Sequence, residues 1–237
     1  MARRRTQPVE LAIGAAPRFP DPNDFDADGL VAFSGELTPA TLLAAYSAGI
    51  FPWYSEETVP LWWSPDPRAV MTPDRLHVSR SLQKTIRRGG FELSWNRCFE
   101  AVMTCCGENR DEGTWVMPEM VEAYVALHRL GHAHSLEVWM DGQLVGGTYG
   151  VQRGALFAAE SMFHRRTDMS KVALVALVRS LFAAGIELLD VQFVTPHLAS
   201  MGAFTMPRSA YLRAVRSAAA KGVDLRLLRP DPLAGGR

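Results

Sequence analysis

The sequence predicts an α+β protein in two parts, a smaller N-terminal α/β domain over residues 1–75 and a larger domain over residues 76–237. Three observations predict this class. Proline and tryptophan are concentrated before residue 75, three consecutive segments after residue 132 alternate apolar and polar residues with period two, and a long apolar helical segment follows them. Hydrophobic residues make up 48% of the chain and charged residues 21%, which is the usage of a globular protein with a sizeable core.

The N-terminal part begins with an irregular stretch and then predicts one helix over residues 39–48. Thr38 is suited to cap this helix, Pro39 suits its first position, and Gly49 suits its end. Residues 51–71 follow, and they are rich in tryptophan and proline. We expect them to form a rigid loop that presents flat aromatic faces.

The second part alternates helices and strands. A helix is predicted between Ser79 as its cap and Gly89 as its end, a strand over 91–95, a helix opened by Asn96, and a helix from Pro118 to a stop at Gly131. Three antiparallel strands are then expected over 133–140, 143–151 and 155–163, with turns at 141–142 and 152–154.

A strongly apolar helix is predicted next, capped by Ser170 and stopped by Gly185, and a strand over 186–194 and a short helix from Pro196 follow it. The order helix, three strands, helix, strand matches the core of the acetyltransferase-like (GNAT-type) fold. In that fold a crossover helix joins an antiparallel sheet to a strand that pairs in parallel. The fold by itself does not identify the reaction.

Charge and cysteine content exclude several classes of protein. The formal net charge is zero, so a polyanionic partner has to be bound by a local basic patch. The three cysteines, Cys98, Cys105 and Cys106, provide neither a disulfide framework nor zinc-site spacing, so we expect reduced thiols and no metal. The start of the chain lacks a signal-peptide pattern and no segment is long enough to span a membrane, which together predict a cytoplasmic protein.

Two polar residues interrupt the apolar strand "LLDVQF". Asp190 and Gln192 are two positions apart and should share one face of the strand, while Leu189, Val191 and Phe193 should point into a core.

Glu160 interrupts the strand 155–163 in the same way, so a catalytic site formed by Glu160, Asp190 and Gln192 is predicted. The structural alternative is that a carboxylate here pairs with a nearby arginine or lies at a sheet edge in water.

Two further features of the sequence indicate which ligands it can bind: a basic helix face and the absence of a glycine loop. Arg80, Lys84, Arg87 and Arg88 recur at helical spacing and could neutralise phosphates, although such a face is also typical of a solvated helix. The junction "FHRRTDMSKVAL" before the crossover helix contains no glycine, so it lacks the loop that cradles the pyrophosphate of coenzyme A. No cofactor is expected.

Eight segments in order resemble the bacterial leucyl/phenylalanyl-tRNA–protein transferase family. They are "AYSAGIFPWY", "LWWSPDPRAV", "LHVSRSL", "EGTWV", "EAYVALHRLGHAHSLEVW", "LVGGTYGV", "ESMF" and "LLDVQF", within residues 27–215. The resemblance implies transfer of leucine or phenylalanine, and less readily methionine, from aminoacyl-tRNA to proteins that begin with Arg or Lys, which marks them for degradation through the N-degron pathway. It also implies an acetyltransferase-like catalytic domain behind a smaller N-terminal domain.

The resemblance also implies roles for individual residues. For the acceptor side our hypothesis is that Asp190 orients Gln192 by hydrogen bonding and that the Gln192 carbonyl oxygen helps to take up the proton of the attacking amine. Glu160 and Asp190 are expected to make the acceptor pocket negative. Trp63 and Trp115 are expected to pack against the terminal adenosine of tRNA. An apolar pocket for the aminoacyl group is expected from Tyr124, Phe157, Ser161, Met162, Leu177 and Leu181.

Four positions near the expected pocket depart from the family pattern. Members often carry Met at Thr148, Gly at Ala159, and Phe near Leu177 and Leu181, so the donor ranking stays open. Two other functions remain as alternatives: an acyl-coenzyme A N-acyltransferase of the same fold, and a non-catalytic RNA-binding module that uses the tryptophans and the basic helix face.

Overall fold

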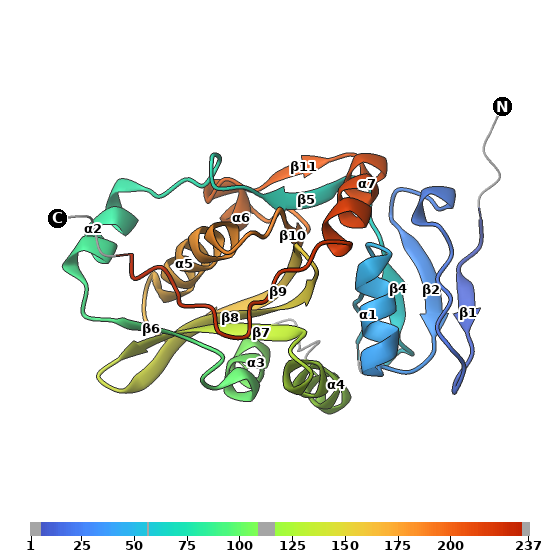
Figure 1. Ribbon diagram of the computed structural model, residues 1–237, viewed down its shortest axis with the longest axis horizontal. Coiled ribbons are helices and arrows are strands. Elements are labelled where there is room, and N and C mark those ends of the chain that lie inside the picture. The colour runs from blue at the N-terminus through green and yellow to red at the C-terminus, as the bar shows by residue number, and fades with distance from the viewer. Residues whose placement is uncertain (1–5, 56, 109–116, 234–237) are drawn as a thin grey trace.

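The computed structural model describes residues 6–55, 57–108 and 117–233, which form two β-sheets with helices around them (Figure 1). The smaller sheet has the strand order β1-β2-β4-β3. Its elements, with the short helices of this part, are β1 (Val9–Leu11), η1 (Pro22–Asp24), β2 (Leu30–Ser34), α1 (Pro39–Ser47), β3 (Phe51–Pro52) and β4 (Leu61–Trp63).

The larger sheet has seven strands in the order β11-β5-β10-β9-β8-β7-β6. Its strands are β5 (Arg68–Met71), β6 (Glu92–Trp95), β7 (Ala133–Met140), β8 (Gln143–Arg153), β9 (Leu156–His164), β10 (Leu188–Gln192) and β11 (Phe204–Met206). The helices of this part are α2 (Arg80–Arg88), α3 (Phe99–Gly107), α4 (Pro118–Arg129), α5 (Met169–Ala183), α6 (Pro196–Ser200) and α7 (Arg208–Ala219).

The predicted topology of the larger sheet is confirmed. Strands β7, β8 and β9 pair antiparallel in sequence order, and β10 pairs parallel to β9 after the crossover helix α5. The hairpin between β7 and β8 turns at Asp141 and Gly142, which both have positive φ, as a two-residue hairpin turn of this kind requires. This is the acetyltransferase-like arrangement expected from the order of the segments.

Helices cover both faces of the larger sheet (Figure 1). Helix α5 lies on one face, where its buried residues form a core with Leu136, Phe157 and Leu189. Helices α3 and α4 lie on the other face, and their core continues into α1 and Trp62 of the smaller sheet. No helix among the described residues is both long and apolar enough to cross a membrane.

The segment 51–71 differs from its prediction as a loop. It contains β3, β4 and β5, and Trp62 is completely buried in the core. The indole of Trp62 donates a hydrogen bond to the Ser34 carbonyl (2.9 Å), so pairing with β2 explains why this tryptophan-rich segment is a strand. Strand β5 pairs with β10 and β11, so residues 68–71 are part of the larger sheet although they precede the predicted boundary after residue 75.

Helix caps were predicted correctly where a side chain reaches the first turn. Thr38 and Ser79 accept hydrogen bonds from backbone N–H groups three residues on, and they cap α1 and α2. The predictions for Asn96 and Ser170 were wrong. Cys98 is at the cap of α3, since Asn96 bonds instead to His134 and to the backbone of Ser135, and Asp168 is at the cap of α5.

Gly49 ends α1 at the contact between the two parts. Its φ is +73°, and a Cβ built there would lie 2.5 Å from Leu212 and 3.0 Å from Tyr211, both on α7. Glycine is therefore required for two separate reasons, the left-handed backbone and the close approach of α7.

We predict that Gly49→Ala lowers the free energy of unfolding by about 2–4 kcal/mol, because backbone strain and overpacking add. Gly142→Ala is the matched control, since Gly142 also has positive φ (+71°) but no heavy atom within 4 Å of a built Cβ. Urea unfolding of both variants is the measurement. Equal decreases in the two variants would show that the packing against α7 contributes nothing.

Candidate functional site

The predicted polar residues lie where two neighbouring parallel strands part. Strands β9 and β10 pair from Leu188–Leu156 to Asp190–Ala158 and no further. Each strand has an irregularity at this point. Glu160 has no partner residue in the β8–β9 pairing, and Val191 has none in the β10–β5 pairing, so the register shifts at both residues. Bulges of this kind redirect side chains and are frequent beside active sites.

The carboxylate of Asp190 is completely buried and accepts four hydrogen bonds. Arg68 binds it in a bidentate manner, with Nε 2.8 Å from Oδ1 and Nη2 2.6 Å from Oδ2. The Tyr211 hydroxyl donates to Oδ2 (2.9 Å), and the backbone N–H of Gln192 donates to Oδ1 (2.9 Å). Both oxygens of this carboxylate are therefore held by protein donors from three elements.

Arg68 is enclosed on all sides. Its guanidinium carbon lies 4.6 Å from the ring centres of both Phe51 and Tyr211, and Nη1 donates to the Gly49 carbonyl (3.2 Å). Burial is the largest single effect and lowers the pKa of Arg68, but the charge and hydrogen bond of Asp190, with Tyr211 and Glu160, together outweigh it and raise the pKa above its ordinary value. Burial raises the pKa of Tyr211 well above its usual range, so its hydroxyl remains a hydrogen-bond donor.

Gln192 is the last residue of β10 and has a left-handed backbone, with φ of +57°. The residue is 8% exposed, and its side-chain amide nitrogen donates to Oε1 of Glu160 (3.3 Å). The structure thus brings together Glu160, Asp190 and Gln192, as the sequence predicted. Leu189 and Val191 point into the core as expected, but the prediction for Phe193 was wrong: the chain turns after Gln192, and Phe193 is 40% exposed.

Glu160 is half-buried beside two buried tyrosines, Tyr46 and Tyr124, whose hydroxyl oxygens are 2.7 Å apart. Loss of hydration raises the pKa of Glu160 to about 8. The hydroxyls of the tyrosines and the charge of Arg68 oppose this increase, and the charge of Asp190 adds to it. A carboxyl group with such a pKa exchanges its proton near neutral pH.

The structural alternative for Asp190, pairing with an arginine, is confirmed by the contact with Arg68. This pairing does not remove Asp190 from the site, since the same carboxylate also binds the backbone of Gln192. Sequence reasoning did not single out Arg68, Tyr211 or Tyr46. The need for a cation opposite a buried aspartate was the available signal, but many arginines in the chain could have met it.

Aromatic side chains continue from Gln192 toward the smaller sheet. Phe193 lies 5.6 Å from Trp53 and 5.8 Å from Phe51, and Trp53 lies 6.0 Å from Trp63, all between ring centres. Trp63 is half-buried and its indole donates to the Trp53 carbonyl (2.7 Å), whereas Trp53 is 47% exposed. Trp53 therefore offers more open ring surface than the predicted Trp63. Trp115 lies outside the described residues.

The residues predicted to form the aminoacyl pocket fall into two groups. Phe157, Met162, Leu177 and Leu181 belong to the core beside α5. Tyr124 belongs to the core on the opposite face of the sheet, and Ser161 is half-buried on β9, where its carbonyl accepts a hydrogen bond from Thr148 (2.9 Å). Their joint role as one pocket stays a prediction.

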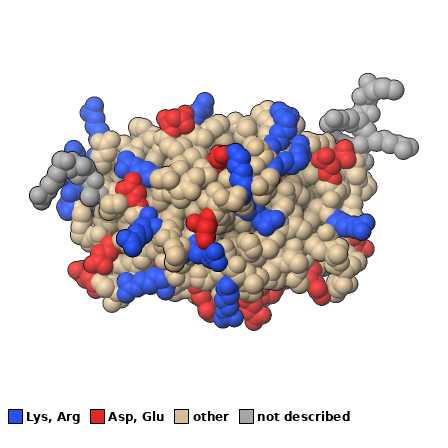
Figure 2. All heavy atoms as spheres, in the orientation of Figure 1, with Lys and Arg blue, Asp and Glu red and all other residues tan. Residues whose placement is uncertain are grey.

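The basic residues of α2 are exposed, as predicted. Arg80, Lys84, Arg87 and Arg88 lie on the outside of a helix that packs through Leu82. Figure 2 shows that lysine and arginine side chains are scattered among acidic ones on the face in view, in keeping with the zero net charge. Phosphates can therefore be attracted only where several basic side chains lie close together, as on α2.

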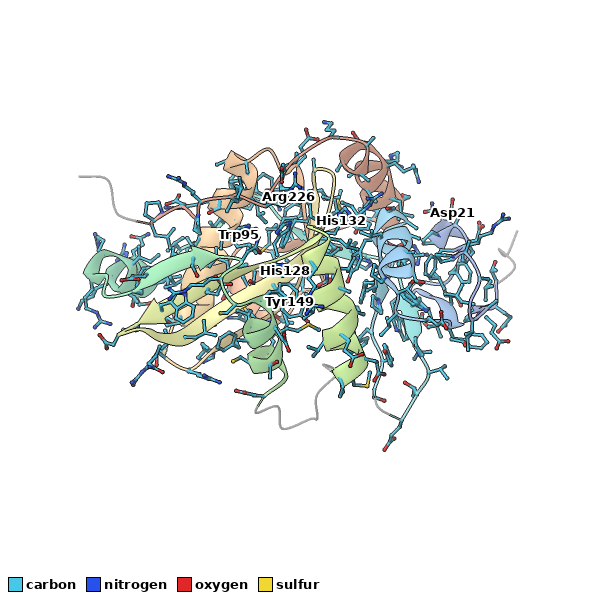
Figure 3. The ribbon with its side chains drawn as sticks, turned by 60° about the horizontal axis from the view of Figure 1, so that its bottom comes forward. Asp21, Trp95, His128, His132, Tyr149 and Arg226 are labelled. Atoms are coloured by element: carbon cyan, nitrogen blue, oxygen red, sulfur yellow. The ribbon has the colours of Figure 1, made fainter. Side chains whose placement is uncertain are left out.

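Other titratable residues have structural partners. His134 is buried between Asn96 and Gln152, and burial lowers its pKa to about 4. Figure 3 shows that His128 and Tyr149 lie beside the larger sheet, whereas Asp21 lies at the smaller sheet. Within the part of the chain that the structure describes, no group of three or more His, Cys, Asp or Glu side chains could hold a metal ion.

The N-terminus of α5 bears on the coenzyme A alternative. Asp168 occupies the cap position, where its carboxylate pairs with Lys171 (3.0 Å) and accepts a hydrogen bond from Thr85 of α2 (3.2 Å). A carboxylate in this position repels a pyrophosphate.

A surface pocket of about 920 Å³ lies over α3. None of the predicted catalytic or substrate-binding residues lines this pocket.

Comparisons with known proteins relate both parts of the chain to one family. A family model described as leucyl/phenylalanyl-tRNA protein transferase matches residues 70–216, and a model of the N-terminal domain of the same family matches residues 35–66. The division between the two models lies next to β5.

Curated relatives with the name leucyl/phenylalanyl-tRNA–protein transferase cover most of the chain. The protein from Anaeromyxobacter sp. (strain Fw109-5) is 52% identical over 85% of this chain and 88% of its own, and that from Aromatoleum aromaticum is 53% identical over 78% and 79%. Among solved structures, a GCN5-related N-acetyltransferase from Kribbella flavida is similar over 68% of this chain and 57% of its own, with 13% identity and a TM-score of 0.37.

We predict that Glu160 contributes a decrease in stability as the pH rises from about 4.5 to 8, which opposes the increase that the lowered pKa of His134 contributes below about pH 6.5. Because the pKa of Glu160 is raised from 4.5 to about 8 on folding, the folded state binds more protons than the unfolded state in this window. Glu160→Gln should reduce the decrease, measured as the free energy of urea unfolding at several pH values. Glu122→Gln, an exposed carboxylate on α4, is the control. Identical pH dependence in wild type and Glu160→Gln would contradict the burial of this charge.

Proposed function

Because the chain belongs to the leucyl/phenylalanyl-tRNA protein transferase family, we propose that it transfers an aminoacyl group from tRNA to the N-terminus of acceptor proteins. Leucine and phenylalanine are the proposed donor residues, with methionine less readily used, and proteins that begin with Arg or Lys are the proposed acceptors. The observation that supports this most directly is the contact between the Gln192 amide and Glu160 at the point where β9 and β10 part. No cofactor is needed, since the ester bond of aminoacyl-tRNA is already activated.

The reaction joins the α-amino nitrogen of the acceptor to the carbonyl carbon of the aminoacyl ester. The carbon–oxygen bond to the ribose breaks, and the proton that the amine loses is finally taken up by the leaving ribose oxygen. The amine must be unprotonated when it attacks, and a free α-amino group has a pKa of about 7.7–8.0.

Glu160, with a pKa of about 8, is matched to exchange a proton with the incoming amine. Since the Gln192 amide nitrogen donates to Glu160, its carbonyl oxygen is available to accept a hydrogen bond from the amine. Gln192 then acts mainly by alignment, which alone contributes much of the rate in reactions of activated esters. Asp190 is paired with Arg68, so the negative potential that favours a basic acceptor comes from Glu160 when it is ionised.

The donor tRNA is proposed to bind through two surfaces. Trp53 and Trp63, with Phe193, offer aromatic rings on which the terminal adenosine can stack next to Gln192. The exposed basic face of α2 can bind phosphates. Degradation of the modified proteins through the N-degron pathway and a cytoplasmic location follow from this function as parts of the same proposal.

The two alternatives predict different outcomes. An acyl-coenzyme A N-acyltransferase would need a pyrophosphate site, and Asp168 at the start of α5 opposes one. A non-catalytic RNA-binding module would not need a buried, fully bonded carboxylate that holds the residue beside Glu160. Acetyl transfer without tRNA would support the first, and RNA binding without transfer would support the second.

We predict that the protein transfers labelled leucine from tRNA to a peptide beginning with Arg, phenylalanine similarly, and isoleucine much more slowly. A β-branched side chain differs near the ester and should be discriminated by about 10- to 100-fold. The measurement is incorporation of label into peptides starting with Arg, Lys or Asp, with Leu-, Phe-, Met- and Ile-tRNA as donors. The absence of transfer from all four tRNAs would refute the proposed function.

Gln192→Ala should lower the transfer rate by about 100-fold or more while leaving tRNA affinity nearly unchanged, because the amine loses the group that aligns it. Gln143→Ala, at an exposed position at the start of β8, is the control for loss of a glutamine. The readouts are single-turnover transfer and filter binding of tRNA. A Gln192→Ala variant with the wild-type transfer rate would remove Gln192 from the chemistry.

Replacing Arg80, Lys84, Arg87 and Arg88 with Ala should weaken tRNA binding and flatten its salt dependence. For each phosphate that the variant no longer neutralises, the slope of log K against log salt should fall by roughly 0.7–0.9. Arg213→Ala with Arg216→Ala, at exposed positions on α7, removes charge elsewhere and serves as the control. If the slope stays at its wild-type value, phosphates are bound at another surface.

A further inference from the structure

Arg68 links the two parts of the molecule to the site. It lies at the start of β5, it donates to the carbonyl at the end of α1, and it binds the carboxylate in β10. No step of the proposed chemistry assigns it a role, and its guanidinium is completely buried, so it cannot reach a tRNA phosphate in this structure.

The contacts of Arg68 continue to Gln192 through one carboxylate. Oδ1 of Asp190 accepts from both Arg68 Nε (2.8 Å) and the Gln192 backbone N–H (2.9 Å). Gln192 needs such support, because a residue with a side chain in the left-handed region is strained by roughly 1–2 kcal/mol. The position of the Asp190 carboxylate thus determines the backbone from which the Gln192 amide reaches Glu160.

We propose that Arg68 is a positioning residue of the transfer reaction: by fixing the Asp190 carboxylate, it holds Gln192 in the left-handed conformation that directs its amide at Glu160. The proposal rests on the proposed function. Lysine could not replace Arg68, because the bidentate contact with Asp190 needs a planar guanidinium and the contacts over the rings of Phe51 and Tyr211 favour one.

The matched control is Arg208, a second buried arginine that joins the same two parts of the molecule. Its guanidinium donates to the backbone carbonyls of Phe25, Asp26 and Ser64 at 2.6–2.9 Å. These three hydrogen bonds do not lead to Asp190 or Gln192. Arg208→Lys therefore tests the loss of a buried guanidinium from the same interface.

The experiment measures single-turnover transfer, KM for Leu-tRNA, and urea unfolding for Arg68→Lys and Arg208→Lys. We expect Arg68→Lys to lower kcat by about 100-fold with KM changed less than about threefold, as a small misplacement of an aligning group does. Arg208→Lys should lose stability but keep the kcat of the folded protein. Equal kcat values in the two variants would overturn the proposal.

The test of the pathway is the double variant Arg68→Lys, Gln192→Ala. If Arg68 acts through Gln192, adding Arg68→Lys to Gln192→Ala lowers kcat little further, whereas independent effects multiply.

A second variant covers the case in which Arg68→Lys does not fold. Tyr211→Phe removes one hydrogen bond to the same carboxylate and should lower kcat by about 3- to 10-fold. A wild-type kcat for Tyr211→Phe, or multiplying effects in the double variant, would refute the positioning role. Failure of the wild-type protein to transfer would instead refute the proposed function.

Discussion

Burying the carboxylate of Asp190 imposes the constraint that organises this molecule. A charge without water needs a full set of partners, and here Arg68, Tyr211 and the backbone of Gln192 supply four hydrogen bonds. Removing one member of a buried pair typically costs about 3–5 kcal/mol, because the other charge is left without compensation. Since the partners come from β5, α7 and β10, these elements are fixed relative to one another by the same group that supports the site.

The position of this group at the end of β10 explains why polar chemistry is found in an apolar sheet. Strands β9 and β10 pair only up to Asp190 and Ala158, and the next polar residues, Glu160 and Gln192, meet where the strands part. Beyond this point no backbone hydrogen bonds connect the described residues of β9 and β10, and a hydrogen bond between the side chains of Gln192 and Glu160 connects them instead. Partial burial at this position also raises the pKa of Glu160 into the range where amines titrate.

Local patterns predicted much of the fold, and long-range pairing explains what they missed. The caps at Thr38 and Ser79 and the β7–β8–β9 meander depend on residues close in sequence, so period and cap chemistry were sufficient. The residues of the candidate site were also predicted to converge, because Glu160 interrupts an apolar strand as Asp190 does. Arg68 is 122 positions from Asp190, and nothing local distinguishes it from other arginines. Likewise, Phe193 leaves the core because of the turn at Gln192, which strand alternation does not anticipate.

The acetyltransferase-like sheet raises the question of which groups occupy the N-terminus of its crossover helix. The crossover helix α5 still presents its N-terminus, but Asp168 occupies it, paired with Lys171 and bonded to Thr85 of α2. The positive end of the helix dipole is thus compensated from within the protein rather than by a phosphate. Packing of α2 against this end also places its basic residues on the outside, available to a larger anion. The same contacts therefore disfavour a small pyrophosphate at this end of α5, and they leave the basic face of α2 exposed for the proposed contact with RNA.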